Sequence, residues 1–326
     1  MILSFKNLML AGSFAITVPA MAIADANINL PDLAFAPEGI SNDASGNLYV
    51  GSLTQGRIVK IAPQSAEVSD FVAAGSNGLV TVVGLHVAGS QTFVCSSDPG
   101  IGALTGTAVP ALVAFDTTTG QPSGRYPLPE GGVFCNDIAE LPDGTILATD
   151  SFAPRIYALT PGADQLEVWL DDNRFSGEGF NLNGIAYDEG SVFVARYNAG
   201  TLHQIEVDTE GRAGTVTDLE MSEEIHGADG LTALGDGRFL IVEGGGLSAG
   251  ARGALWGAKL SDETIQLEAI ATDLNVPTTA TVVGRTAYVV EGQLDHLFDP
   301  EAGPAAPYRI LAIELPETFQ QSLKGN

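Results

Sequence analysis

The chain is poor in basic residues. Only 14 residues are Lys or Arg, against 40 Asp or Glu, and the net charge at neutral pH is −26. Phosphate backbones and anionic membrane surfaces attract clustered basic side chains, so the composition argues against nucleic acid and anionic lipid as partners. We interpret the acidity as a source of solubility, with the attraction of cations as the alternative.

Charged residues of both signs and long apolar runs are also scarce. Charged residues make up 17% of the chain, too few for a coiled coil or a disordered acidic segment. After residue 24 no stretch is long and apolar enough for a transmembrane helix, so we expect no membrane insertion. Glycine is abundant, with 39 residues, which predicts many tight turns and argues against long helices.

The first 24 residues have the pattern of a signal peptide. They contain one Lys, Lys6, no acid, and an apolar run from Leu8 to Val18, followed by alanines at positions 20, 22 and 24 that offer cleavage sites. We therefore expect residues 1–24 to be a signal peptide, residues 25–326 to form the mature domain, and the protein to be periplasmic or secreted. The alternative is a core strand or an anchoring helix.

Cysteine is nearly absent. The two residues, Cys95 and Cys135, are too few for a disulfide framework. An oxidising compartment would permit one bridge between them, and the alternative is two buried thiols that pack as small apolar groups. The sequence leaves this choice open.

One motif recurs six times along the chain: a short head, a strand, a turn rich in Asp, Gly or Asn, and a second strand. The copies begin near residues 37, 82, 135, 182, 228 and 277. We call the second residue of each copy its head residue, and the six are Glu38, Val83, Asn136, Asn183, Asp229 and Thr278. Their separations are 45, 53, 47, 46 and 49 residues, a period typical of β-propeller blades.

The period predicts an all-β, six-bladed β-propeller with four-stranded blades. Third β-rich runs follow the motif at residues 56–62, 111–116, 155–160, 200–207, 253–260 and 308–315. A weaker fourth run follows in most copies, such as 167–170 and 216–219. The last copy has no fourth run, so we expect residues 27–35 to supply it and to close the ring. A stacked β-solenoid, the other architecture considered, needs a shorter period.

Four of the six head residues carry side-chain oxygens. The innermost strands of a propeller begin near its axis, so we expect Glu38, Asn136, Asn183 and Asp229 to face one another there. Two carboxylates at a narrow channel repel unless a cation compensates, and Ca²⁺ prefers such an oxygen set. We predict a metal site formed by these four residues, for Ca²⁺ or another divalent cation such as Mg²⁺, Mn²⁺ or Zn²⁺. The alternative is that they cap strand ends or turns.

The heads also resemble those of a known family. The segments PEGI at 37–40, FCNDI at 134–138, LNGIAYD at 182–188 and GADGLT at 227–232 are similar to those of the senescence marker protein, gluconolactonase and luciferin-regenerating enzyme family. Paraoxonase and diisopropyl fluorophosphatase are more distant relatives on the same plan. The resemblance covers the mature chain and implies a divalent-metal-dependent hydrolase of lactones or related esters. Its metal set falls on Glu38, Asn183 and Asp229, with Asn136 as the fourth.

Two positions depart from the family pattern. Sugar-lactone hydrolases of the family tend to carry an Arg two residues before the blade-three Asn, where this chain has Phe134. Paraoxonase-like enzymes have a His at the head of blade two, where this chain has Val83, with His86 three residues later. A more apolar lactone or ester fits these two residues better than a sugar lactone does.

The resemblance implies that the metal polarises the substrate carbonyl and that Asp229 activates water as a general base. Asp137, Asp150, Glu243 and Glu291 also lie near strand ends, and we interpret them as turn or surface acids. The two histidines His226 and His296 are interpreted as polar loop residues, with a place at the channel mouth as the alternative.

Two other readings of function stay open. One is a phosphotriesterase-like hydrolase with the same metal, and the other is a non-catalytic binding propeller stabilised by the ion. A small molecule is the expected partner. The sequence identifies neither the substrate, the preferred metal nor the oligomeric state, nor whether residues 99–110 and 244–250 cover the site.

Overall fold

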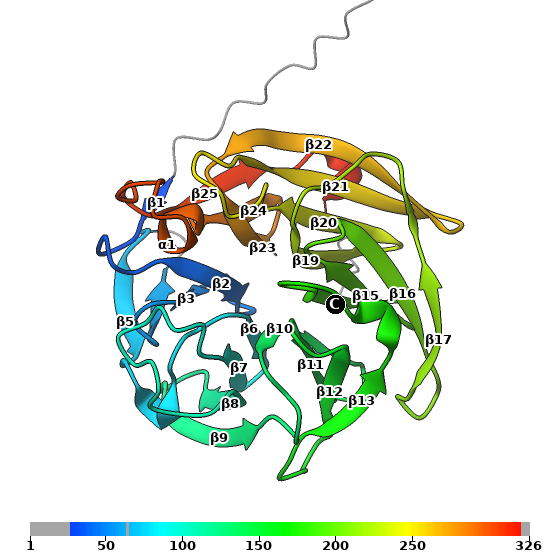
Figure 1. The fold of residues 1–326 in the computed structure, drawn as a ribbon, viewed down its shortest axis with the longest axis horizontal. Helices are drawn as coiled ribbons and strands as arrows, with labels where there is room; N and C mark the ends of the chain where they lie inside the picture. Colours follow the sequence, from blue (N-terminus) through cyan, green and yellow to red (C-terminus); the bar gives the residue numbers. More distant parts are fainter. Residues whose placement is uncertain (1–26, 63–64, 321–326) are drawn as a thin grey trace, which may run out of the picture.

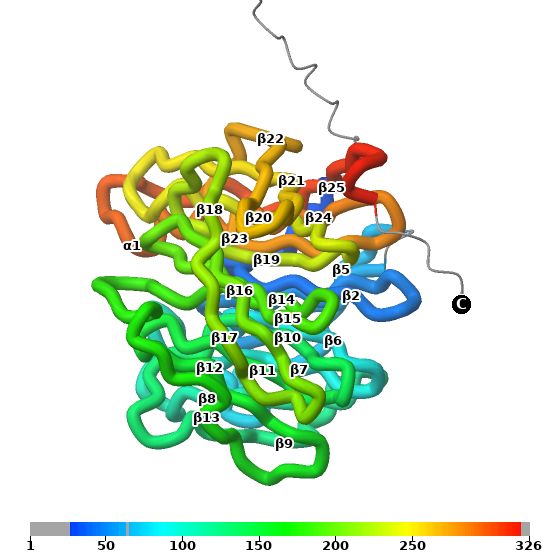
Figure 2. Tube along the Cα trace, turned by 90° about the vertical axis from the view of Figure 1, so that its right-hand side faces the viewer, coloured from blue at the N-terminus to red at the C-terminus, as the bar shows by residue number. Residues whose placement is uncertain are grey.

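Six antiparallel sheets stand around a central axis in the computed structural model, which describes residues 27–62 and 65–320 (Figure 1). The predicted six-bladed β-propeller is therefore confirmed. Figure 2 shows the ring edge-on, with the short helix α1 (Asp295–Phe298) at one of its faces. Within the described residues no helix has both the length and the hydropathy to cross a membrane. The predicted signal peptide, residues 1–24, lies outside the described part of the chain.

The strands follow one another outward within each blade. Blade one consists of β2 (Pro37–Asn42), β3 (Leu48–Ser52), β4 (Ile58–Ile61) and β5 (Val68–Val72). Blade two consists of β6 (Leu85–Ala88), β7 (Gln91–Ser96), β8 (Ala111–Asp116) and β9 (Pro122–Pro127). Blade three consists of β10 (Cys135–Glu140), β11 (Ile146–Asp150), β12 (Arg155–Leu159) and β13 (Glu167–Asp171). Blade four consists of β14 (Leu182–Asp188), β15 (Ser191–Arg196), β16 (Thr201–Val207) and β17 (Ala213–Asp218).

Blade five departs from the four-stranded pattern. It consists of β19 (Ala228–Gly235), β20 (Arg238–Glu243), β21 (Gly253–Ser261) and β22 (Thr264–Leu274), with a fifth strand, β18 (Glu220–Met221), outside β22. The β18 strand pairs parallel to β22, because the chain runs up beside the long blade-five hairpin before it enters the blade. Sequence analysis missed this strand, since two residues carry no periodic pattern.

Blade six closes the ring. It consists of β23 (Pro277–Val283), β24 (Thr286–Glu291) and β25 (Arg309–Glu314), and its outermost strand is β1 (Ile28–Asn29) from the other end of the domain. Ile28 pairs with Ile310, and the Leu30 N–H donates to the Tyr308 carbonyl at 2.9 Å. The prediction that the N-terminal stretch supplies this strand is confirmed. The pairing covers the edge of β25, which would otherwise present unpaired backbone groups.

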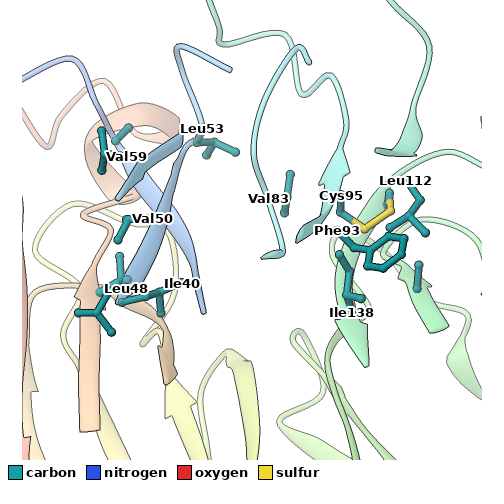
Figure 3. Packing of buried hydrophobic residues seen from close by; sticks show 14 of the residues in the cluster. Ile40, Leu48, Val50, Leu53, Val59, Val83, Phe93, Cys95, Leu112 and Ile138 are labelled. Carbon is teal, nitrogen blue, oxygen red and sulfur yellow. A yellow bond between two sulfur atoms is a disulfide. The ribbon is translucent and has the colours of Figure 1, made fainter. Parts of the chain in front are cut away.

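The apolar core lies between neighbouring blades. The second strand of a blade is covered on both sides, and all five residues of β3 and of β11 are buried. Outermost strands such as β5 and β13 consist mostly of half-buried and exposed residues, which suits the rim of the ring. Figure 3 shows part of one core cluster, with Leu48 and Val50 at the left of the view and Phe93 and Leu112 at the right.

A disulfide joins Cys95 at the end of β7 to Cys135 at the start of β10, so it links blades two and three (Figure 3). The two Cα atoms are 5.0 Å apart, and no other cysteine is present. Both cysteines are fully buried in the core. The question that the sequence left open is thus answered in favour of the bridge.

Candidate functional site

A β-bulge at the start of the innermost strand positions the head residue of nearly every blade. In five blades the pairing with the second strand skips two residues, the head residue and the one after it. In blade one, for example, Pro37 pairs with Ser52 and the next pair is Ile40 with Val50. Bulges re-aim side chains next to functional sites. Here the bulge lifts the head residue out of the in-and-out alternation of the strand and lets it face the axis.

Glycine follows the head residue in blades one, two, four and five because the neighbouring blade lies against it. A Cβ at Gly39 would overlap the Val83 carbonyl, and one at Gly184 would overlap the Asp229 carbonyl. The same holds for Gly84 against Asn136 and for Gly230 against Thr279. These glycines therefore bring the innermost strands close together around the axis.

The four predicted metal ligands lie together at a constriction of the channel. On one side is the upper pocket, whose empty space is about 440 Å³ when the part open to solvent is included and whose lining includes Phe298 of α1. On the other side is the lower cavity, whose empty space, counted in the same way, is about 230 Å³. Among the described residues, the side chains that line both spaces are Glu38, Asn136, Asn183 and Asp229. All four are buried.

The constriction places negative charge where water cannot solvate it. Burial, followed by the nearby charges of Asp229 and Asp137, raises the pKa of Glu38 well above its usual value. Burial and Asp137 raise the pKa of Asp229 as well, although a hydrogen bond from the Asn183 side chain opposes that shift. Buried like charges favour either protonation or a compensating cation. The site is therefore electrostatically suited to a divalent ion.

The donor chemistry of the four residues fits a hard cation. The Asn136 amide donates from Nδ2 to Ser151 Oγ at 2.8 Å, and Ser151 donates on to the Leu182 carbonyl at 2.7 Å. This chain of bonds turns the amide oxygen of Asn136, the atom that a hard cation binds, away from its protein partner. In the described part of the chain no three His, Cys, Asp or Glu side chains form a cluster that could hold a metal ion by themselves. The set therefore relies on amide oxygens and suits Ca²⁺, Mg²⁺ or Mn²⁺ better than Zn²⁺.

Asp137 occupies the position that glycine holds in four other blades. Its carboxylate accepts a hydrogen bond from the Ile185 N–H of the next blade at 3.1 Å and lines the lower cavity. Burial raises its pKa to about 6. The interpretation of Asp137 as a turn or surface acid is therefore wrong, because the bulge turns its side chain into the channel.

The other acids near strand ends hold the loops that enter the blades. Asp150 is fully buried and accepts from the backbone N–H groups of Val133 and Phe134 at 2.7 and 3.0 Å, and from the Tyr157 hydroxyl at 3.0 Å. Glu243 and Glu291 stand at the equivalent position of their blades. Glu243 accepts a hydrogen bond from the backbone N–H of His226, and Glu291 accepts one from the backbone N–H of Asn275. Each donor lies two residues before the innermost strand of its blade. These three are turn-holding acids, as predicted, and Asp150 fixes the segment that carries Phe134.

The histidines do not reach the constriction. His86 lies at the opposite mouth of the channel, where its Nε2 is 3.3 Å from the Glu140 carboxylate. His226 is exposed, and His296 Nδ1 is 3.0 Å from the Gly303 carbonyl. Val83 lines the upper pocket where paraoxonase-like enzymes are expected to have a His.

Apolar side chains form the wall of the upper pocket above the four ligands. We call them the apolar collar: Leu53, Val83, Pro99, Phe134, Phe180, Leu247, Leu294 and Phe298. Pro99 and Leu247 come from the two segments whose role the sequence left open, so both segments contribute to the wall. Phe180, Leu247 and Phe298 lie in loops of unequal length and were missed, because no repeat alignment reaches them.

Tyr197 stands at a repeated position of the blades, and the sequence did not single it out. It directly follows the second strand of blade four, where the other blades have Leu53, Ser97, Ser151, Gly244 and Gly292. Its side chain lines the upper pocket and is 7% exposed, and its hydroxyl has no hydrogen-bond partner among the described residues. Burial, with a smaller contribution from Asp229, raises its pKa. An alignment of the strand ends could have identified it.

No protein-family model and no curated protein matches the chain. Solved structures do. The calcium-binding protein regucalcin from Agrobacterium tumefaciens superposes with a TM-score of 0.62 at 17% identity, over 89% of this chain and 94% of that one. The likeness is one of fold. A gluconolactonase from Xanthomonas campestris superposes with a TM-score of 0.60 at 16% sequence identity, over 88% of both chains. Virginiamycin B lyase from Staphylococcus aureus superposes with a TM-score of 0.57 at 12% sequence identity, over 89% of this chain and 99% of that one.

These neighbours fit the resemblance to the senescence marker protein and gluconolactonase family that the heads indicate. They include enzymes of more than one kind, a gluconolactonase and a lyase, on one propeller plan. Since one fold supports several chemistries, the function of this chain has to be argued from its own site.

Proposed function

We propose that this protein is a metal-dependent hydrolase of a lactone or a related ester, with Ca²⁺ as the cation. The observation that carries the proposal is the constriction itself. Two buried carboxylates, Glu38 and Asp229, and two amides, Asn136 and Asn183, meet at the floor of an apolar pocket. The gluconolactonase and the calcium-binding protein among the structural neighbours support it.

The four side chains would hold the ion through their oxygen atoms. When bound, Ca²⁺ would supply Lewis acidity at the carbonyl oxygen of the substrate. We assign to Asp229 the role of accepting the proton of the attacking water, since its carboxylate lines the pocket floor. With a substrate bound, the apolar collar would limit the access of water to the floor, which would strengthen electrostatic interactions there.

We further propose that residues 1–24 direct the chain to the periplasm or out of the cell. The disulfide between Cys95 and Cys135 supports this, because disulfides form and persist in oxidising compartments.

The test is acid release from a panel of lactones by the purified mature chain, with EDTA and with Ca²⁺ added back. We expect EDTA to abolish hydrolysis and Ca²⁺ to restore it. Asp229→Asn, assayed at Ca²⁺ concentrations that saturate the variant in calorimetry, should lose roughly a hundredfold or more in kcat while it remains folded. Ca²⁺ binding without hydrolysis of any lactone would contradict the proposal and favour a binding propeller. Hydrolysis of aryl phosphotriesters alone would favour the phosphotriesterase-like alternative.

A further inference from the structure

The lining of the upper pocket is polar at the constriction and apolar above it. Its polar lining consists of the four ligands and Tyr197, whereas the apolar collar forms the rest. Of the described residues that line it, none is Lys, Arg or His. The wall therefore offers neither a positive charge for a carboxylate or phosphate nor hydrogen-bonding groups for a row of sugar hydroxyls.

The collar is a packed structure with fixed neighbours. Phe180 contacts Phe134, Phe152, Tyr197 and Phe298, with ring centroids 5.7, 4.8, 6.3 and 6.3 Å apart. These rings come from blades three, four and six. They bring together edges and faces of aromatic rings, which are favourable surfaces for an apolar ligand.

Two further segments of the collar are hydrogen-bonded to each other. The loop that carries Leu247 donates backbone hydrogen bonds from Ala249 to the Asp299 carboxylate at 2.8 Å and from Gly250 to the Asp295 carboxylate at 3.3 Å. The residues that accept these bonds flank Phe298, which also lines the pocket. Blades five and six therefore present Leu247 and Phe298 as one wall.

Tyr197 marks where the polar end of a ligand lies. Its hydroxyl is buried and lacks a partner in the described structure, and the side chain lines the same pocket as Asp229. A buried polar group without a partner is costly, and a ligand that accepts its hydrogen bond removes that cost. The hydroxyl thus provides a hydrogen-bond donor in the same pocket as the four predicted metal ligands.

We propose that the substrate is a hydrophobic carbonyl compound: a lactone ring or ester at the floor, hydrogen-bonded by Tyr197, with an alkyl or aryl substituent in the apolar collar. This inference rests on the proposed function for the reaction. The ligand class rests on the collar and on Tyr197.

The substituent should be recognised by its length. For γ-lactones with progressively longer side chains, kcat/KM of the Ca²⁺-loaded mature protein should rise roughly fourfold per buried CH₂ until the collar is full. Glucono-lactone should be a poor substrate. Leu247→Ser and Phe298→Ser, two half-buried positions, should flatten this dependence on chain length. Val168→Ser, on the exposed surface of β13, serves as the matched control.

Tyr197→Phe should give a different signature, because it removes the donor and keeps the ring. We expect a loss of roughly two- to tenfold that is the same for every chain length. A loss that grows with chain length would assign Tyr197 to the collar instead and would overturn its place at the polar end.

Binding without turnover separates this inference from the proposed function. Displacement of the neutral fluorescent probe N-phenyl-1-naphthylamine by 2-alkyl cyclopentanones, which have no ester bond, should follow the same dependence on chain length. If this occurs without hydrolysis of any lactone, the hydrolase proposal fails and the ligand class stands. If lactones are hydrolysed with no dependence on length, or glucono-lactone is preferred, the ligand class is wrong and the hydrolase stands. No displacement by any ketone would also overturn the ligand class.

Discussion

The disulfide allows stability to be separated from the site that it adjoins. Cys135 directly precedes Asn136, so a bridge that positioned the ligand would affect metal binding, whereas a bridge that only restrains the chain would affect unfolding. Asn136 has independent anchors: its side chain donates to Ser151, and its carbonyl accepts from the Gly84 N–H at 2.6 Å. We therefore predict that Cys95→Ala/Cys135→Ala lowers stability and leaves Ca²⁺ affinity within about threefold of the wild type, less than the loss of one hydrogen bond would cause.

The loop length gives the magnitude. The two cysteines are 40 residues apart in sequence. The chain-entropy relation for a loop of this length gives roughly 4 kcal/mol at 25 °C. A propeller of about 300 residues has an unfolding entropy near 0.6 kcal/mol/K, so the melting temperature should fall by about 6 °C.

Calorimetric melting of the double variant and Ca²⁺ titration of the same sample test both halves. The reduced wild type is the second sample to compare with the oxidised wild type. Because both cysteines are buried, the disulfide has to be reduced by unfolding the protein in urea with a reductant and refolding it. The same treatment should not change the double variant, which is the internal control. An unchanged melting temperature would refute the entropic reasoning, and a Ca²⁺ affinity that falls as far as in Asn136→Ala would refute the independence of the site.

Two further predictions concern the constriction. In EDTA, the raised pKa values of Glu38 and Asp229 mean that the folded state binds protons more tightly than the unfolded state, so stability should increase as pH falls from 8 toward 5. Thermal melts should show this slope, and Ca²⁺ or Asp229→Asn should reduce it; an equal slope in that variant would assign the effect to the overall negative charge. Gly184→Ala should cost roughly 1–3 kcal/mol and weaken Ca²⁺ binding, because the added Cβ meets the backbone of Asp229. Gly214→Ala on β17, where the nearest atom is the Glu206 Cβ at 3.2 Å, is the control, and equal effects in the two variants would contradict the argument.

The architecture was predictable because each blade repeats its pattern. Six copies at a nearly constant period leave few alternatives to a ring, and the missing fourth run of the last copy pointed to residues 27–35. The third strands begin and end within about two residues of the predicted runs, as for β8 (Ala111–Asp116). Register within the copies also predicted that Glu38 and Asp229 face each other at the axis, and both side chains line the upper pocket.

What the sequence could not show depends on contacts between different blades. The bulge places two residues, Asn136 and Asp137, opposite the single residue Thr149 without altering the composition of the strand, so the inward turn of Asp137 had no signal in the alternation of side chains. The pairing of two cysteines is decided by the distance between blades two and three. The collar likewise combines Phe180, Leu247 and Phe298 from loops that differ in length from blade to blade.

The strand that completes blade six has a kinetic consequence. Ile28 and Ile310, which pair across that seam, are 282 positions apart, so the last contact of the ring is among the most distant in the chain. Such non-local pairing slows folding, because the closure entropy is lost before the contact forms. The four ligands come from blades one, three, four and five, and their mutual distances are fixed only once the circle is complete. High-affinity Ca²⁺ binding should therefore develop with the slowest phase of refolding, which makes the ion a reporter of ring closure.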